Sequence, residues 1–363
     1  MFYYLIHRIA DYQNTPLRLI DYVTFRAGAA LLTTFFLCII FGPVTVRMLK
    51  NAIAANRYEG VIDEKFIDRS KDKTPSMGGI LIVLAITVST CLWSNFASLL
   101  TPVFIGTLLT FSALGFVDDY YKIFRKDKNG ISSRTKLIFQ TLLAVLALSA
   151  IWVISPDTFC QFTVPFMKEP LWILPLPLAF LYGCLVVVGA SNAVNITDGK
   201  DGLVVGSMIP CALTYGVFAY MTGHFKFAEY LNVNFISGAA EVSVFAAAII
   251  GACIGFLWFN CKPAAMFMGD TGSLALGAVI GLIAVLVKQE LLLVIVGGVF
   301  VMEIVTVMIQ IFTVRLFNKR FFRCTPIHHH FEQGGWAETQ IVTRFWIISI
   351  LLALVGLATL KLR

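Results

Sequence analysis

Charge is scarce in this chain, because only 13% of its 363 residues are Asp, Glu, Lys or Arg, while 58% are hydrophobic. A soluble globular domain carries about 25% charged residues, so this composition excludes that class. The apolar runs are long and continuous, and they lack the alternation that strands of a membrane barrel require. Composition therefore predicts helices that span a membrane.

The chain also lacks a cysteine framework and a recognisable targeting segment. Its eight cysteines are scattered, with no CxxC pair, so neither a disulfide framework nor a zinc site is predicted. The first 24 residues lack the charged start, apolar core and cleavage site of a signal peptide, so we expect membrane insertion to begin with the first apolar run. No internal repeat or low-complexity stretch is present, and we predict a single integral-membrane domain over residues 1–363.

Ten apolar runs approach the roughly 20 residues that a helix needs to cross hydrocarbon. They cover residues 25–46, 77–94, 99–117, 136–154, 171–190, 203–222, 242–259, 273–288, 291–314 and 343–361. The predicted fold is an all-α polytopic membrane protein with about ten transmembrane helices. Pro175 and Pro177 predict a kink in the fifth run, and the preceding loop 155–170 contains a pattern typical of a short hairpin.

Positive charge is divided unevenly between the two ends of these runs. Of the 28 Lys and Arg residues, 20 lie in loops after odd-numbered runs. Those loops are therefore predicted to be cytoplasmic, with both termini outside. The net charge of +7 suits anionic lipid headgroups or a polyphosphate substrate and needs no nucleic acid. A solvated, lipid-facing role suffices for most of the basic residues near the inner surface, which include Lys71, Lys122, Lys126, Lys136, Lys200 and Lys262.

Four polar patches stand out, and each lies at the end of an odd-numbered run. They are Asp118-Asp119, residues 192–202, residues 260–272 and His328-His329-His330. A membrane protein that gathers acids, amides and histidines on one face is expected to do chemistry there.

The acids of the first three patches each allow two interpretations. Asp118 and Asp119 point about 100° apart on a helix, so one can face a site while the other binds a metal or caps structure, or both can mark the membrane boundary. The Asp-Gly pairs of residues 198–202 make tight turns or expose N–H groups that cradle phosphate. Asp270 is either a helix N-cap, in competition with Ser273, or an open ligand for a hard cation such as Mg²⁺.

The remaining candidates are also open to two interpretations. Phe267 stacks on a base or anchors the chain at the membrane interface. Adjacent histidines diverge and seldom bind one metal together, so residues 328–330 suit either a metal site or hydrogen bonds to phosphate. Glu303 and Gln310 share one helical face, where Glu303 is either functional or paired with another helix.

Five segments carry a resemblance to one family. They are residues 74–79 (TPSMGG), 115–119 (GFVDD), 192–203 (NAVNITDGKDGL), 267–274 (FMGDTGSL) and 325–332 (TPIHHHFE). In order, and over nearly the whole chain, they resemble the phospho-N-acetylmuramoyl-pentapeptide transferases (MraY, translocase I). The acidic signatures are shared with the wider polyprenyl-phosphate N-acetylhexosamine-1-phosphate transferase superfamily, and the histidine run narrows the resemblance to this family.

The resemblance implies a Mg²⁺-dependent transfer of phospho-MurNAc-pentapeptide from UDP-MurNAc-pentapeptide to undecaprenyl phosphate, which gives lipid I and UMP. It implies an enzyme of peptidoglycan synthesis in the lipid bilayer of the bacterial cytoplasmic (inner) membrane, with both termini periplasmic. Members of the family often form homodimers, for which this sequence holds no signal of its own.

Residue roles are implied in the same way. Asp118 is the favoured base for the lipid phosphate, while a two-step route with an aspartate nucleophile stays open. Asp270 is the Mg²⁺ ligand, Asp119 lies near the metal or the substrate phosphates, and His328 binds or orients phosphate. The implied substrate-binding residues are Asn192, Asn195, Asp198 and Asp201 in the nucleotide pocket, Phe267 near the uracil, His329 and His330 behind His328, and Lys71, Ser76, Asn260 and Gln310 as further contacts.

Two residues depart from the family pattern. Ser76 stands where Thr is usual, which keeps a hydroxyl, and Lys200 adds a charge where an apolar residue is usual. The nearest alternative function is a sister transferase that uses UDP-GlcNAc, although the histidine run favours the muramoyl donor. A cation-coupled transporter would need acids near mid-membrane on several helices. A structural scaffold would give no reason for the gathered glycines and acids.

Overall fold

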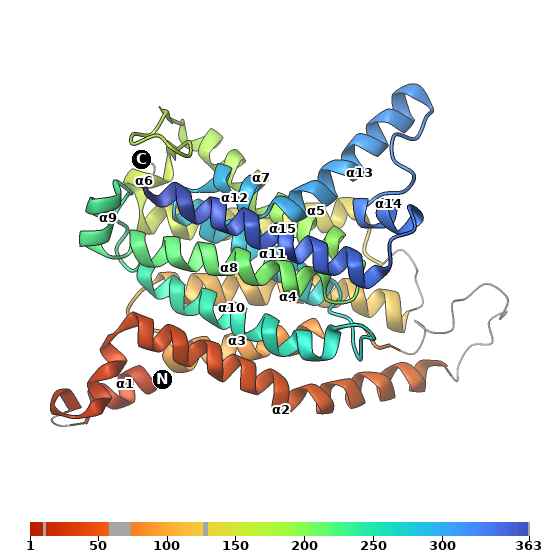
Figure 1. The fold of residues 1–363 in the computed structure, drawn as a ribbon. Helices are drawn as coiled ribbons and strands as arrows, with labels where there is room; N and C mark the ends of the chain where they lie inside the picture. Colours follow the sequence, from red (N-terminus) through yellow and green to blue (C-terminus); the bar gives the residue numbers. More distant parts are fainter. Residues whose placement is uncertain (10–11, 58–73, 126–129, 362–363) are drawn as a thin grey trace.

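The structure, a computed structural model, describes residues 1–9, 12–57, 74–125 and 130–361. Helices make up almost all of its regular structure and are stacked side by side in a bundle (Figure 1). Within the described residues, eight helices are long and apolar enough to cross a membrane. They are α2 (Val23–Arg57), α4 (Leu100–Phe124), α5 (Ser133–Ile154), α7 (Leu176–Thr197), α8 (Leu203–Thr222), α10 (Ala239–Asn260), α13 (Gly298–Phe317) and α15 (Glu338–Ala358). The predicted all-α polytopic fold is confirmed, and the number of crossings stays a prediction.

Shorter elements complete the described chain. The apolar helices α3 (Gly79–Trp93) and α11 (Asp270–Leu286) coincide with the second and eighth predicted runs. The other helical segments are α1 (Phe2–His7), η1 (Tyr12–Asn14), η2 (Pro16–Asp21), α6 (Pro156–Phe159), α9 (Phe225–Leu231), α12 (Glu290–Val296), α14 (Ile327–Gln333) and η4 (Thr359–Lys361). Strands β1 (Gln161–Phe162) and β2 (Trp172–Ile173) pair antiparallel. The predicted hairpin is therefore present, with its second strand just beyond residue 170.

Helix α11 forms the centre of the bundle. Every residue from Thr271 to Leu286 is buried, as expected for a helix that is apolar on all sides. Helices α4 and α7 flank it, and α10 packs against α2 and α8. Gly115 allows the close approach of α4, because a Cβ atom there would collide with the Asp270 carbonyl group. The start of α11 is thus fixed against the end of α4.

Two predictions about the apolar runs are wrong. Helix α7 begins at Leu176, so Pro175 precedes it and Pro177 lies in its first turn. The N–H groups of a first turn have no partner within the helix, so proline is tolerated there and no kink follows. The ninth run is not one helix, because it divides at Gly297 into α12 and α13. Figure 1 shows α13 projecting away from the bundle toward the upper right.

The two termini lie at the same end of the bundle, at the left of Figure 1. Helix α14 lies at the opposite end, below the projecting α13. This arrangement agrees with the predicted placement of both termini on one side and the histidine run on the other. The compartment that each end faces stays a prediction from the distribution of Lys and Arg.

Candidate active site

Two carboxylates from different helices share two ammonium groups at the end of the bundle opposite the termini. Asp118 lies near the end of α4, and Asp270 is the first residue of α11. Lys122 Nζ lies 2.8 Å from Asp118 Oδ2 and 3.0 Å from Asp270 Oδ2. Lys136 Nζ, from α5, lies 3.2 Å and 2.6 Å from the same two atoms. We call these four residues the acid–lysine cluster, in which Asp118 is buried, Asp270 and Lys136 are half-buried and Lys122 is the most exposed member.

Asp119 turns away from this cluster and caps α11. Its Oδ1 accepts a hydrogen bond from Asp270 N at 3.2 Å, and its Oδ2 accepts from Thr271 N at 3.0 Å and from Thr271 Oγ1 at 2.7 Å. A carboxylate is stabilising at a helix N-terminus. The N-cap position itself belongs to Gly269 and not to Asp270 or Ser273. Gly269 has φ +74°, and a Cβ atom there would lie 2.7 Å from Asp119 Oδ2, so this position requires glycine.

One of the two predicted amides on α7 joins the acid–lysine cluster. Asn195 Nδ2 donates to Asp270 Oδ1 at 2.7 Å and to Ser273 Oγ at 2.9 Å. Asn192 Nδ2 donates instead to Gln140 Oε1 at 2.9 Å. Asn195 therefore helps to orient Asp270, whereas Asn192 ties α7 to α5.

The acids of the loop between α7 and α8 bind the backbone of the loop before α11. Asp198 Oδ2 accepts from Gly269 N at 3.2 Å, and Asp201 Oδ2 accepts from Ala264 N at 3.2 Å. Burial, followed by the neighbouring Asp270 carboxylate, raises the pKa of Asp198 to about 8. These two acids hold the two loops together. Through them the loop between α7 and α8 lies beside the start of α11.

The segment before α3 is joined to the same loop by backbone hydrogen bonds. Phe267 N donates to Pro75 O at 2.8 Å, and Gly78 N donates to Phe267 O at 2.8 Å. Ser76 is half-buried here. Its Oγ lies against Gly269, where an added Cβ atom would be 2.9 Å away. Both predicted substrate contacts, Ser76 and Phe267, thus lie close to the start of α11.

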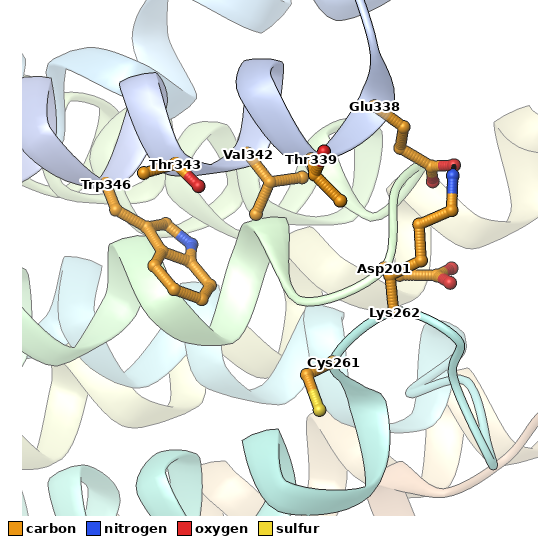
Figure 2. A pocket seen from close by; sticks show the side chains of 8 residues that line it. All are labelled: Asp201, Cys261, Lys262, Glu338, Thr339, Val342, Thr343 and Trp346. Atoms are coloured by element: carbon orange, nitrogen blue, oxygen red, sulfur yellow. Dashed lines mark hydrogen bonds and ion pairs between the residues drawn. The ribbon is translucent and has the colours of Figure 1, made fainter.

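A cavity of about 200 Å³ opens beside Asp201 and α15. Figure 2 shows Lys262 reaching Glu338 across it, and these two side chains form an ion pair. Asn260 lies next to this cavity, since its Oδ1 accepts from Gly202 N at 3.0 Å. The complete lining is Asp201, Cys261, Lys262, Glu338, Thr339, Val342, Thr343 and Trp346. Of the predicted site residues, Asp201 faces this space.

The three histidines of α14 have different surroundings. His328 is fully buried, with its Nδ1 3.0 Å from Glu303 Oε1 of α13. His329 Nδ1 lies 3.0 Å from Glu332 Oε2, and His330 Nδ1 accepts from a backbone N–H of the preceding loop at 3.2 Å. Glu303 therefore pairs with another helix, which was one of its two interpretations. Binding of phosphate by His328 stays a prediction.

Of the two remaining predicted substrate contacts, the structure describes only Gln310. Gln310 Oε1 accepts from Phe321 N at 3.1 Å and from Phe322 N at 2.9 Å, so its side chain holds the loop that follows α13. Lys71 lies outside the described residues. Substrate contact by either residue stays a prediction.

The sequence predicted a solvated role for most of the basic residues near the inner surface, and the structure shows that Lys122 and Lys136 instead pair with the two acids. Lys122 follows Asp118 by four residues, a spacing that places both on one helical face, so the sequence did contain a signal. Lys136 comes from α5, and no spacing in the sequence indicates its position. Thr271 and Gln140 were also missed, because their partners lie on other helices.

The donor atoms between α4 and α11 suit a hard cation. Within the described chain, no three His, Cys, Asp or Glu side chains gather into a metal site. Asp118 and Asp270 nevertheless direct their Oδ2 atoms at the same two ammonium groups, so positive charge already lies between them. Carboxylate oxygens are the ligands that Mg²⁺ prefers, and these two residues fit such an ion.

Comparisons with known proteins agree with this geometry. Residues 101–288 match the family model described as Glycosyl transferase family 4, and residues 71–83 match Phospho-N-acetylmuramoyl-pentapeptide-transferase signature 1. The chain is 44% identical to a phospho-N-acetylmuramoyl-pentapeptide-transferase of Maricaulis maris (strain MCS10) over 374 residues, with 100% of both chains covered. It is 45% identical to the protein of that name from Neisseria gonorrhoeae (strain NCCP11945) over 362 residues, with 98% of this chain and 99% of the relative covered.

Proposed function

The chain belongs to the phospho-N-acetylmuramoyl-pentapeptide transferase family, and from this premise we propose its reaction. It transfers phospho-MurNAc-pentapeptide from UDP-MurNAc-pentapeptide to undecaprenyl phosphate, giving lipid I and UMP. This is a step of peptidoglycan synthesis in the bacterial cytoplasmic (inner) membrane. The acid–lysine cluster is the structural observation that supports the proposal best, because it combines carboxylates for proton and metal binding with cations for phosphate.

The position of the cluster suits substrates that arrive from two phases. It lies at the ends of membrane helices, on the side that the Lys and Arg distribution predicts to be cytoplasmic. The soluble nucleotide reaches such a site from water, and the lipid phosphate reaches it along the inner leaflet. Bringing the two together supplies proximity, which lowers the barrier of a bimolecular reaction.

The members of the cluster divide the chemistry between them. Asp118 takes the proton of the lipid phosphate, whose oxygen then attacks the sugar-linked phosphorus of the donor. The bond between the two donor phosphates breaks, and UMP leaves. Lys122 and Lys136 exchange their carboxylate partners for phosphate oxygens as the substrates bind, so they offset the charge that grows during transfer.

Asp270 is the proposed protein ligand of Mg²⁺. Asn195 holds one of its carboxylate oxygens, and the other points into the cluster. Bound there, Mg²⁺ supplies Lewis-acid stabilisation of the pyrophosphate. Asp119 helps to hold Asp270 in place, because it accepts hydrogen bonds from the first backbone N–H groups of α11.

The nucleotide binds beside these residues. Asn195 would contact it from the end of α7, and Asp198 and Asp201 from the loop between α7 and α8. Phe267 would lie near the uracil. Ser76, Asn192, Asn260 and the histidine run are further contacts or supports of the same pocket. Lys71 and Gln310 are kept as substrate contacts on the resemblance alone.

The test is turnover by the purified protein in detergent with undecaprenyl phosphate, Mg²⁺ and one nucleotide donor at a time. We expect release of UMP and a lipid-linked product with UDP-MurNAc-pentapeptide, and no release when undecaprenyl phosphate is left out. Preference for UDP-GlcNAc would replace the proposal with the sister reaction. Inactivity with both donors, in protein shown to be folded, would remove it.

A further inference from the structure

Lys200 is a nearly buried lysine in the loop that carries Asp198 and Asp201. Its side chain is only 1% exposed, and its Nζ lies 2.6 Å from Glu332 Oε2 of α14. Lysine is almost never buried without a partner, so this contact determines where the side chain lies. Lys200 is also the residue that adds a charge where the family pattern usually has an apolar residue.

Glu332 of α14 pairs with two side chains. Besides Lys200, its Oε2 lies 3.0 Å from His329 Nδ1 one turn earlier. Lys200 and then His329 lower the pKa of Glu332 to about 2, which keeps it a carboxylate. The carboxylate is 42% exposed, so water reaches it as well.

The loop touches α14 at a second, adjacent point. A Cβ atom at Gly199 would lie 2.6 Å from His328 Nε2, so the loop backbone closes over that ring. On the other side, His328 faces Glu303 of α13. Helix α14 is therefore held between α13 and the loop, and the same loop binds Gly269 next to Asp270 through Asp198.

We propose that Lys200 is a positioning residue, whose ion pair with Glu332 locks α14 and its histidines against the loop beside the acid–lysine cluster. The inference rests on the proposed function, because it concerns how the donor side of that site is held. Lys200 touches no reacting atom in this account. Its contribution is to keep two chain segments, more than a hundred residues apart in sequence, in one arrangement when the nucleotide binds.

Because Lys200 is buried and Glu332 is exposed, substitutions of the two residues should differ in effect. Glu332→Gln leaves a buried ammonium group without a counter-charge, which is strongly unfavourable. Lys200→Met keeps the volume of the side chain and leaves a carboxylate that water can solvate. We therefore expect Glu332→Gln to be the more harmful change, and the double variant to recover toward Lys200→Met. Lys361→Met, which removes a lysine bonded to Tyr230 far from α14, is the matched control.

Two readouts are measured on the full chain in detergent: the midpoint of thermal unfolding and the affinity for UDP-MurNAc-pentapeptide by calorimetry. Glu332→Gln should lower the midpoint and weaken donor binding by about tenfold, and the double variant should regain most of both. Additive effects, a worse Lys200→Met, or unchanged donor affinity in all variants would overturn the proposal. Wild type that binds no donor and releases no UMP refutes the proposed function instead, while the unfolding midpoints still test the ion pair.

Discussion

The acid–lysine cluster and the Glu303–His328 pair lie at the same end of the bundle, but they differ in access to water. The lysine side chains of the cluster are 38% and 14% exposed, whereas Glu303 and His328 are exposed by 0% and 1%. An ammonium group on a flexible stem can change partners when a phosphate arrives. A fully buried pair cannot separate without leaving a polar group unsatisfied. The cluster is therefore suited to chemistry, and the buried pair to joining α13 and α14.

The sequence offered candidate charged groups for both regions, although Glu303 lies inside the ninth apolar run and the other acids and histidines lie at or beyond the ends of runs. What separates them is how completely neighbouring residues enclose each one. The cluster has Lys122 at its solvent edge, while His328 is enclosed by Glu303 and Gly199. The predictions below test this division, starting from the largest expected effect.

Asp118→Asn should cause the largest loss of activity. The amide cannot take the proton of the lipid phosphate, and loss of a general base typically lowers kcat by roughly 10²–10⁴-fold. Donor binding, measured by calorimetry, should be retained, because the change leaves the fold in place. The acidic limb of the pH–rate profile should also change. Equal rates and profiles for the variant and wild type would show that Asp118 is not the base.

Much of the fold was readable from the sequence because membrane helices are long and uniformly apolar. Most of each predicted run falls on a helix, since continuous apolar sequence favours helices in lipid. The fifth run nevertheless begins with strand β2, and the ninth is divided between α12 and α13. The break at Gly297 and the start of α7 were not predicted, because glycine and proline act through local backbone geometry that hydropathy does not report. The all-round burial of α11 also depends on neighbours that come from distant parts of the chain.

The candidate site was readable only in part, for a related reason. Asp118, Asp270 and Asn195 do meet, as their shared end of the membrane suggested. Asp119 belongs to the cap of α11, and Lys136 joins the acids from another helix. Contacts between helices leave no periodic signal in a single sequence, so such partners become visible only in three dimensions.

Lys136→Met and Lys122→Met should rank next, in that order. Both lysines contact both acids, but Lys136 is the less exposed of the two, so it should contribute more to stabilising phosphate charge. We expect kcat to fall by roughly 10²-fold for Lys136→Met, comparable to the loss of one oxyanion donor, and by roughly tenfold for Lys122→Met. Steady-state release of UMP measures both. A larger loss in Lys122→Met would contradict the ranking by burial.

His328→Ala should act mainly on folding stability. It leaves the buried Glu303 carboxylate without its partner, which we expect to cost about 1–3 kcal/mol. His328→Gln keeps a donor and should retain more stability and more activity. Thermal unfolding in detergent measures the difference, and elemental analysis serves as the control, because neither variant should change the content of bound metal. Loss of a stoichiometric metal ion in His328→Ala would instead make the run a metal site.

Asp198→Asn should give the smallest effect, and it tests the loop that connects the two regions. Because the pKa of Asp198 is raised to about 8, the folded state keeps a proton that the unfolded state releases near pH 4. Its contribution to stability is therefore complete below about pH 4 and is lost as the pH rises through 8. In metal-free buffer the melting temperature of wild type should fall between pH 6 and pH 9. The fall should be smaller in Asp198→Asn, by a few degrees. Parallel melting curves across this range would mean that Asp198 is already ionised in the folded protein, and the loop would then bring a charge, not a neutral acid, to the start of α11.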